Sequence, residues 1–117
     1  MSEKKPVRLT EEALQIIANQ FGVLAQPLRL QLLNELQFGE RSVGALVEAT
    51  GSNQANVSKH LNLLASAQML SRRKSGLNVY YIISDPIVFQ LCELMCSKLQ
   101  ADFEKKAQTL KHPGRAQ

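Results

Sequence analysis

Two cysteines four residues apart, Cys92 and Cys96, are the first side chains of this sequence that could do chemistry. They are the only cysteines of the chain, and on a helix their spacing places both thiols on one face. Such a pair could hold a soft metal ion, act as a redox switch, or pack as two small apolar residues. Which of these applies depends on the elements that position the pair.

A second group of side chains that could carry function, all polar, follows Gly51, in the stretch SNQANVSKHLNLLASAQ. Val57, Leu61 and Leu64 form an apolar stripe at helical spacing, so this segment is expected to be a helix with Asn53 as its N-cap. The polar face offers amides that suit adenine edges, and hydroxyl and cationic groups that suit phosphate. The candidate DNA-binding residues of this helix are Asn53, Gln54, Asn56, Ser58, Lys59 and His60.

Three consecutive cations, Arg72, Arg73 and Lys74, lie just beyond this helix and complete the set of candidate DNA contacts. The formal net charge is +4, and residues 52–76 contain four basic residues and no acidic one, so this block carries the whole excess. Polar residues on a helix could simply face solvent. A basic block without acids directly beside them favours an anionic partner, and the strand that carries the three cations would meet the DNA backbone or a narrow minor groove.

Capping residues, prolines and apolar spacing predict the elements that position these groups. Helices are expected after Thr10, from Pro27, after Ser42 and after Asn53, followed by a β-hairpin over residues 69–84 and a last helix over 87–110. The two helices of residues 42–67, joined by a glycine-containing turn, match helix-turn-helix spacing. The fold class is therefore mainly α (α+β): a winged helix-turn-helix of five helices with a two-stranded wing, in the order ααααββα. We expect one domain, 1–117, with disordered tails at about 1–8 and 111–117.

The sequence from Val23 to Ile83 resembles the ArsR/SmtB family of bacterial winged-helix repressors. It contains the family's L-A-x-P-x-R-L-x-L-L opening from Leu24, its V-S-x-H-L segment from Val57, and a wing that ends in two tyrosines. The resemblance implies a homodimer formed through the first and last helices, an inverted-repeat operator in double-stranded DNA, and release by an inducer. It also implies that Asn53, Gln54, Asn56, Ser58 and Lys59 meet bases and phosphates, and that the wing arginines meet the minor groove.

Two metal sites that recur in this family lack their ligands in this sequence. At the cysteine positions of the third-helix thiolate site stand Ser42 and Gly44. At the interface zinc site Asp85 is present, but Ile87, Lys98 and Ala101 occupy the other positions, and a lysine ammonium opposes a cation. We therefore expect no metal site of either kind and no cofactor, and we interpret Asp85 as a helix cap.

Cys92 and Cys96 remain as candidate sensing residues on the last helix. At 100° per residue from Val88, Cys92 falls at about 40°, inside the apolar stripe, and Cys96 at about 80°, at its edge. Packing in the subunit interface, a redox or reactive-sulfur switch, and metal or metalloid capture across the dimer all stay open. Cys96 is the thiol that an oxidant should reach first.

The apolar stripe of the last helix itself predicts a dimer. Val88, Leu91, Met95, Leu99, Phe103 and Leu110 present more apolar surface than a terminal helix leaves in water. No membrane-spanning run and no secretory signal is present, so a cytoplasmic location is expected. The residues offer no catalytic constellation, and an enzyme is the least favoured function. Two hypotheses remain: a dimeric repressor, or a winged-helix module for protein contacts without an operator.

Overall fold

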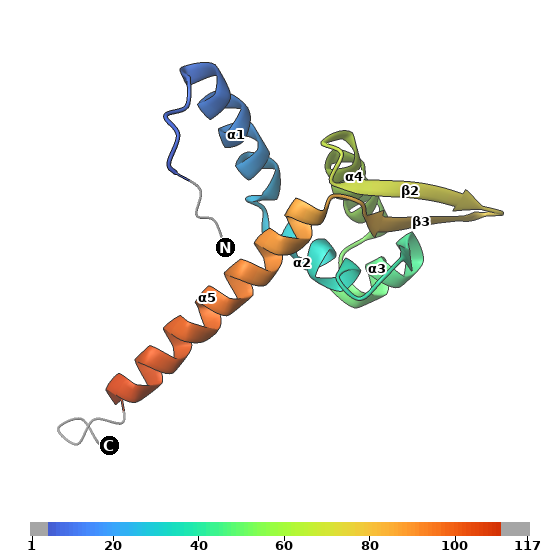
Figure 1. Cartoon of the computed structure of the whole chain (residues 1–117). Helices are drawn as coiled ribbons and strands as arrows, with labels where there is room; N and C mark the ends of the chain where they lie inside the picture. The colour runs from blue at the N-terminus through green and yellow to red at the C-terminus, as the bar shows by residue number, and fades with distance from the viewer. Residues whose placement is uncertain (1–4, 111–117) are drawn as a thin grey trace.

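Five helices and three strands follow one another along residues 5–110, the part of the chain that the computed structural model describes (Figure 1). In chain order they are α1 (Glu11–Leu24), α2 (Pro27–Leu36), β1 (Arg41–Ser42), α3 (Val43–Thr50), α4 (Gln54–Ser66), β2 (Leu70–Ser75), β3 (Asn78–Ile83) and α5 (Pro86–Leu110). This order confirms the predicted winged helix-turn-helix with its five helices. Of the predicted disordered tails, residues 5–8 form neither helix nor strand, and residues 1–4 and 111–117 lie outside the described part.

The predicted capping residues begin three of the helices. The side chains of Thr10, Ser42 and Asn53 accept hydrogen bonds from backbone N–H groups three residues further on, at 3.1, 3.1 and 2.8 Å. Pro27 is the first residue of α2, where its missing N–H costs nothing. Gly51 ends α3 in the left-handed conformation, with φ of 73°, which a residue without a Cβ adopts without strain. The turn between α3 and α4 is thus set by local chemistry.

The hydrophobic core lies where α2, α3 and α4 meet the sheet. Val57, Leu61 and Leu64, the predicted apolar stripe, are fully buried and hold α4 along one side. The other buried apolar side chains come from α2, α3, the α4–β2 turn, the sheet and the first turn of α5. They are Leu32, Leu33, Leu36, Leu46, Met69, Leu70, Tyr81 and Val88. The opposite side of α4 is exposed to solvent.

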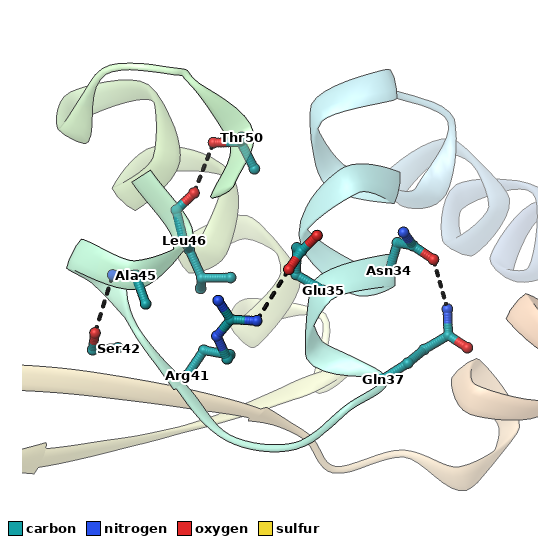
Figure 2. A network of polar contacts seen from close by, with 8 residues as sticks. All are labelled: Asn34, Glu35, Gln37, Arg41, Ser42, Ala45, Leu46 and Thr50. Atoms are coloured by element: carbon teal, nitrogen blue, oxygen red, sulfur yellow. Dashed lines mark hydrogen bonds and ion pairs between the residues drawn. The ribbon is translucent and has the colours of Figure 1, made fainter. Parts of the chain in front are cut away.

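The sheet has three strands, in the order β1-β3-β2, all antiparallel. The predicted wing is its β2–β3 hairpin, whereas β1 is a strand that the sequence pattern did not predict. β1 has two residues, too few to show an alternation, and it pairs Arg41 with Tyr81. An ion pair of 3.0 Å between Arg41 and Glu35 joins β1 to the end of α2 (Figure 2). This contact fixes the entry to the helix-turn-helix relative to α2.

α1 and the C-terminal half of α5 project from this core in different directions (Figure 1). No residue of α1 is fully buried, and its apolar residues Leu14, Ile16 and Phe21 are each about half exposed. On α5, Val88 belongs to the core, whereas the outer part of the helix exposes its apolar stripe. No helix within residues 5–110 combines the length and apolar character needed to cross a membrane.

Candidate nucleic-acid interface

The N-terminal turns of α4 present the amides of the predicted set to solvent. Gln54 and Asn56 are exposed, as is Lys59 one turn further along. Asn53 is exposed too, but its side-chain oxygen is occupied as the helix cap, since it accepts from the backbone N–H of Asn56 at 2.8 Å. Asn53 can therefore offer DNA its amide N–H groups and one remaining lone pair of its oxygen, whereas Gln54 and Asn56 keep both lone pairs.

A hollow of about 360 Å³, which we call the α4–wing hollow, separates α4 from the wing. Gln54 and Ser58 line it from α4, and Arg72 lines it from β2. The other lining residues come from α3, α4 and the hairpin. They are Val43, Gly44, Asn62, Leu77, Asn78, Val79 and Tyr81. The fold thus gathers three of the predicted DNA-binding residues, two from α4 and one from β2, around one concave surface.

Asn62 takes part in this surface although the sequence analysis did not select it. The Tyr81 hydroxyl donates to the Asn62 side-chain oxygen at 3.0 Å, which joins the wing directly to α4. Tyr81 is almost fully buried, so its ring is held in place while its hydroxyl reaches this rim. Spacing could have indicated Asn62, because residues 54, 58 and 62 follow one another at four-residue intervals on one helix face.

The three wing cations do not share one face. In the antiparallel register Arg72 lies opposite Tyr81 and Lys74 opposite Val79, while Arg73 lies opposite Tyr80. Since side chains alternate along a strand, Arg72 and Lys74 share the face of Tyr81, which is turned toward α4. Arg73 is on the other face. The structure therefore separates a run of cations that the sequence presents as one group.

Arg73 is held by an acidic side chain that lies 33 residues away in the sequence. Its Nε and Nη2 donate to the two carboxylate oxygens of Glu40, at 2.9 and 2.8 Å, and its guanidinium lies 4.7 Å from the centre of the Tyr80 ring. The hydrogen bond and the charge of Arg73 lower the pKa of Glu40. Within residues 5–107 neither Arg72 nor Lys74 has such an acidic partner. Two of the three wing cations are thus available to an anion.

His60 is engaged on the side of α4 that faces α2. Arg29 of α2 donates from its Nε to Nδ1 of His60 at 2.9 Å, so the imidazole is an acceptor at that nitrogen. Burial lowers the pKa of His60, and the neighbouring positive charges of Arg29 and Lys59 lower it further. The ring is therefore neutral at pH 7, and it belongs to a contact between helices.

The two cysteines differ in environment. Cys92 is half-buried and packs against the core, whereas Cys96 is exposed. Burial, together with the charge of Cys96, raises the pKa of the Cys92 thiol. Both thiols line an apolar groove of about 420 Å³ between α2 and α5, with Leu30, Met95 and Leu99 among its walls.

Metal-ligating side chains do not gather anywhere in the described residues. No group of three or more histidine, cysteine, aspartate or glutamate residues within this part could hold an ion. Asp85 accepts from the backbone N–H of Ile87 at 2.9 Å, directly before α5 begins, so its interpretation as a helix cap is confirmed.

The sequence matches a family of bacterial regulators and several of its curated members. Residues 26–71 match the model of the family described as "Bacterial regulatory protein, arsR family". The chain is 39% identical over 74 residues to the probable mercury resistance operon repressor of Streptomyces lividans, a match that covers 63% of this chain but only 59% of that protein. It is also 32% identical over 96 residues to the transcriptional repressor SmtB homolog of Synechocystis, with 82% of this chain and 73% of the relative covered.

Solved structures show the same fold with comparable identity. The antimony-specific transcriptional repressor AntR superimposes with a TM-score of 0.79 at 29% identity, over 86% of this chain and 92% of that one. A homodimeric winged helix-turn-helix DNA-binding domain from Mycobacterium bovis superimposes with a TM-score of 0.73 at 33% identity, over 80% and 87% of the two chains. The family match, the identity to curated members and the shared fold lead to one conclusion: the chain belongs to the ArsR/SmtB family of winged helix-turn-helix transcriptional regulators.

Proposed function

We propose that this chain is a homodimeric, sequence-specific DNA-binding repressor that binds an inverted-repeat operator and leaves it when an inducer acts. The observation that carries the proposal is the α4–wing hollow, around which Gln54, Ser58 and Arg72 converge. An α-helix fits the major groove, where amide and hydroxyl groups read base edges. The adjacent hairpin then brings cations to the DNA backbone or the minor groove.

The proposed contacts fall into two groups with different tasks. Gln54 and Asn56 are the base-reading residues, because an exposed amide can bond an adenine edge at two points. Ser58, Lys59, Arg72 and Lys74 supply backbone contacts, which position the protein and add affinity without reading sequence. Asn53 contributes through its amide N–H groups. Arg73 joins the contacts only if the DNA displaces Glu40.

The dimer is supported by the apolar surface that α1 and α5 leave uncovered. Met95, Leu99 and Phe103 of α5 are 61%, 55% and 62% exposed. A contiguous apolar surface on helices that project from the core is typical of a subunit interface. A two-fold dimer places two copies of α4 on the same side of the DNA, and so requires two half-sites in inverted orientation.

For the inducer we propose a thiol-reactive signal, an oxidant or a reactive sulfur species, that acts on Cys96 first. Cys96 is exposed, whereas Cys92 is half-buried and burial raises the pKa of its thiol. Cys96 is therefore the thiol that a reagent in solution can reach more easily. Both thiols line the groove between α2 and α5, and modification there would alter how α5 packs. Metalloid capture by the four thiols of a dimer is the second candidate, and the pairing of the two thiols in one groove is what supports it.

The repressor proposal is tested by selecting a duplex from a random library with the parent protein and measuring affinity by fluorescence anisotropy. We expect a palindromic site, bound at least a thousandfold more tightly than unrelated DNA, with affinity that falls steeply with salt. Gln54→Ala combined with Asn56→Ala should remove most of this preference, and Gln100→Ala, an exposed amide on α5, serves as the control. Equal binding of all duplexes would favour a protein-interaction module instead.

The inducer proposal needs the same operator assay under defined chemistry. Anisotropy is followed with reductant, mild oxidant, polysulfide, zinc and arsenite, for the parent and for Cys92→Ser and Cys96→Ser. We expect oxidant or polysulfide to release the parent, and Cys96→Ser to stay bound. Release by arsenite that requires both cysteines would favour metalloid sensing. A parent that stays bound under every condition would refute thiol sensing while leaving the repressor proposal intact.

A further inference from the structure

Arg29 bonds two other helices at once. Its Nη1 donates to the backbone carbonyl of Val23 at 2.8 Å, and its Nε donates to Nδ1 of His60 at 2.9 Å. Val23 lies in the last turn of α1, Arg29 in the first turn of α2, and His60 in the middle of α4. One side chain thus joins the N-terminal helix to the helix proposed to read DNA, and both of its bonds are partly buried.

One of these bonds satisfies a backbone carbonyl at the end of α1, and the other fixes the protonation of the His60 ring. The carbonyls in the last turn of a helix have no partner within the helix, and a cation there also complements the helix dipole. Arg29 satisfies one such carbonyl of α1, a helix with no fully buried residue, whose last turn otherwise packs Val23 and Leu24 against the core. At the other end, guanidinium can only donate, so His60 must accept through Nδ1 and carries its proton on Nε2. Both the last turn of α1 and the ring of His60 are therefore fixed by the same planar group.

We propose that Arg29 is a positioning residue for DNA binding. By holding Val23 of α1 and His60 of α4 together, it fixes the angle between α1, a helix of the proposed dimer interface, and α4, the helix proposed to read DNA. In a two-fold dimer this angle sets the distance between the two copies of α4, and with it the spacing of the half-sites that one dimer can bind. His60 then acts through Arg29 and needs no contact with DNA. The inference rests on the proposed repressor function and adds to it the residue pair that sets operator spacing.

Half-site spacing is the measurement that separates positioning from general stability. Anisotropy is recorded for the selected palindrome and for versions with one base pair inserted or removed at its centre. We expect the parent to bind the altered sites much more weakly than the selected site. In Arg29→Ala and Arg29→Gln, the ratio between selected and altered spacing should fall about tenfold, the equivalent of one lost hydrogen bond to a charged group. Partial unfolding would weaken all three sites by one common factor and leave the ratio unchanged.

Substitutions of His60 test the same bond from its other end and do not disturb the contact with Val23. His60→Asn retains an acceptor near the place of Nδ1 and should keep the spacing preference of the parent, whereas His60→Leu should lose it as Arg29→Ala does. Arg29→Lys should not restore the preference, because one ammonium lacks the fork that reaches both partners. If an Arg29 variant does not fold, His60→Leu carries the test.

The outcomes distinguish the two proposals. Should the parent show a spacing preference that Arg29→Gln and His60→Leu both retain, the positioning role is wrong and the repressor proposal stands. Should the parent bind all duplexes alike, with no palindrome selected, the repressor proposal itself fails. A loss of spacing preference in His60→Asn equal to that in His60→Leu would mean that an acceptor at Nδ1 does not set the spacing, which also overturns the inference.

Discussion

Glu40→Gln is the substitution that tests most directly how the wing presents its charges. In the parent, both carboxylate oxygens of Glu40 accept from the guanidinium of Arg73, and Tyr80 covers that guanidinium from one side. A glutamine amide has no charge and cannot accept two parallel bonds from the fork, so Arg73 is released. The pair is exposed, and an exposed ion pair adds little to stability, so the fold should be unchanged.

The expected magnitude follows from the number of wing cations that can neutralise phosphate. In the parent Arg72 and Lys74 are available, and the substitution adds Arg73 as a third. Each phosphate neutralised contributes about −0.9 to the slope of log K against log salt concentration. The slope of Glu40→Gln should therefore be steeper by about 0.9, and a fourfold rise in salt should cost the variant roughly 3.5 times more affinity than it costs the parent.

The assay is anisotropy with one operator duplex over a salt series from about 50 to 200 mM, the range in which counterion release dominates. Glu48→Gln is the matched control, since it removes the same charge from α3 but frees no basic side chain among the described residues. The control should shift affinity slightly and keep the parent's slope. Equal slopes for Glu40→Gln and the parent would refute the reasoning, because Arg73 would then either not reach DNA or already leave Glu40 in the complex.

Three further predictions concern the core, the pH dependence and the thiols. Leu61→Ala, at a fully buried position, should lower the free energy of unfolding by about 2–5 kcal/mol in urea titrations, whereas the exposed Leu63→Ala should change it far less. Because the pKa of His60 is lowered from its ordinary 6.5 in the folded chain, the unfolded state takes up this proton first. Stability is then full above about pH 6.5 and declines as the pH falls through the folded pKa, and His60→Asn should remove that part of the decline. Iodoacetamide should label Cys96 faster than Cys92 in peptide mass spectra, and equal rates would contradict the different burial of the two thiols.

The helices could be predicted from the sequence because their signals are local. Thr10, Ser42 and Asn53 cap helices through bonds to residues three positions away, and Pro27 and Gly51 mark a start and an end. β1 gave no such signal, because a two-residue strand is defined only by its partner. That partner, Tyr81, lies 40 residues further along the chain.

The candidate site was predictable in its composition but not in its partnerships. Period-two alternation already implied that Arg73 lies on the other face from Arg72, yet its pairing with Glu40 depends on the α2–β1 turn reaching the wing. His60 shows the same limit. Its place in α4 followed from helical spacing, whereas its bond to Arg29 follows only from the packing of α2 against α4.

The relative burial of the two cysteines could be predicted because it depends only on an angle around one helix. The helical positions placed Cys92 within the apolar stripe and Cys96 at its edge, and the structure confirms that order, with Cys92 packed against the core and Cys96 exposed. Yet the stripe itself is not covered beyond this point: Met95, Leu99 and Phe103 remain largely exposed in one chain. A single sequence specifies which residues are apolar, and the second subunit of the proposed dimer would bury this part of α5.

In the proposed function, a signal at Cys96 on α5 has to change how α4 binds DNA. Cys96 lies on α5, which packs against the core through its first turns, around Val88 and Cys92. A change at Cys96 can therefore act on α4 in two ways. It can act within the chain through the sheet, or through the proposed subunit interface and α1. On the second way Arg29 is a direct polar link, because it joins the last turn of α1 to α4. If the subunit interface carries the signal, His60→Leu should still bind DNA but no longer be released when Cys96 is oxidised. Cys96→Ser should also lose this release, but it should keep the spacing preference of the parent.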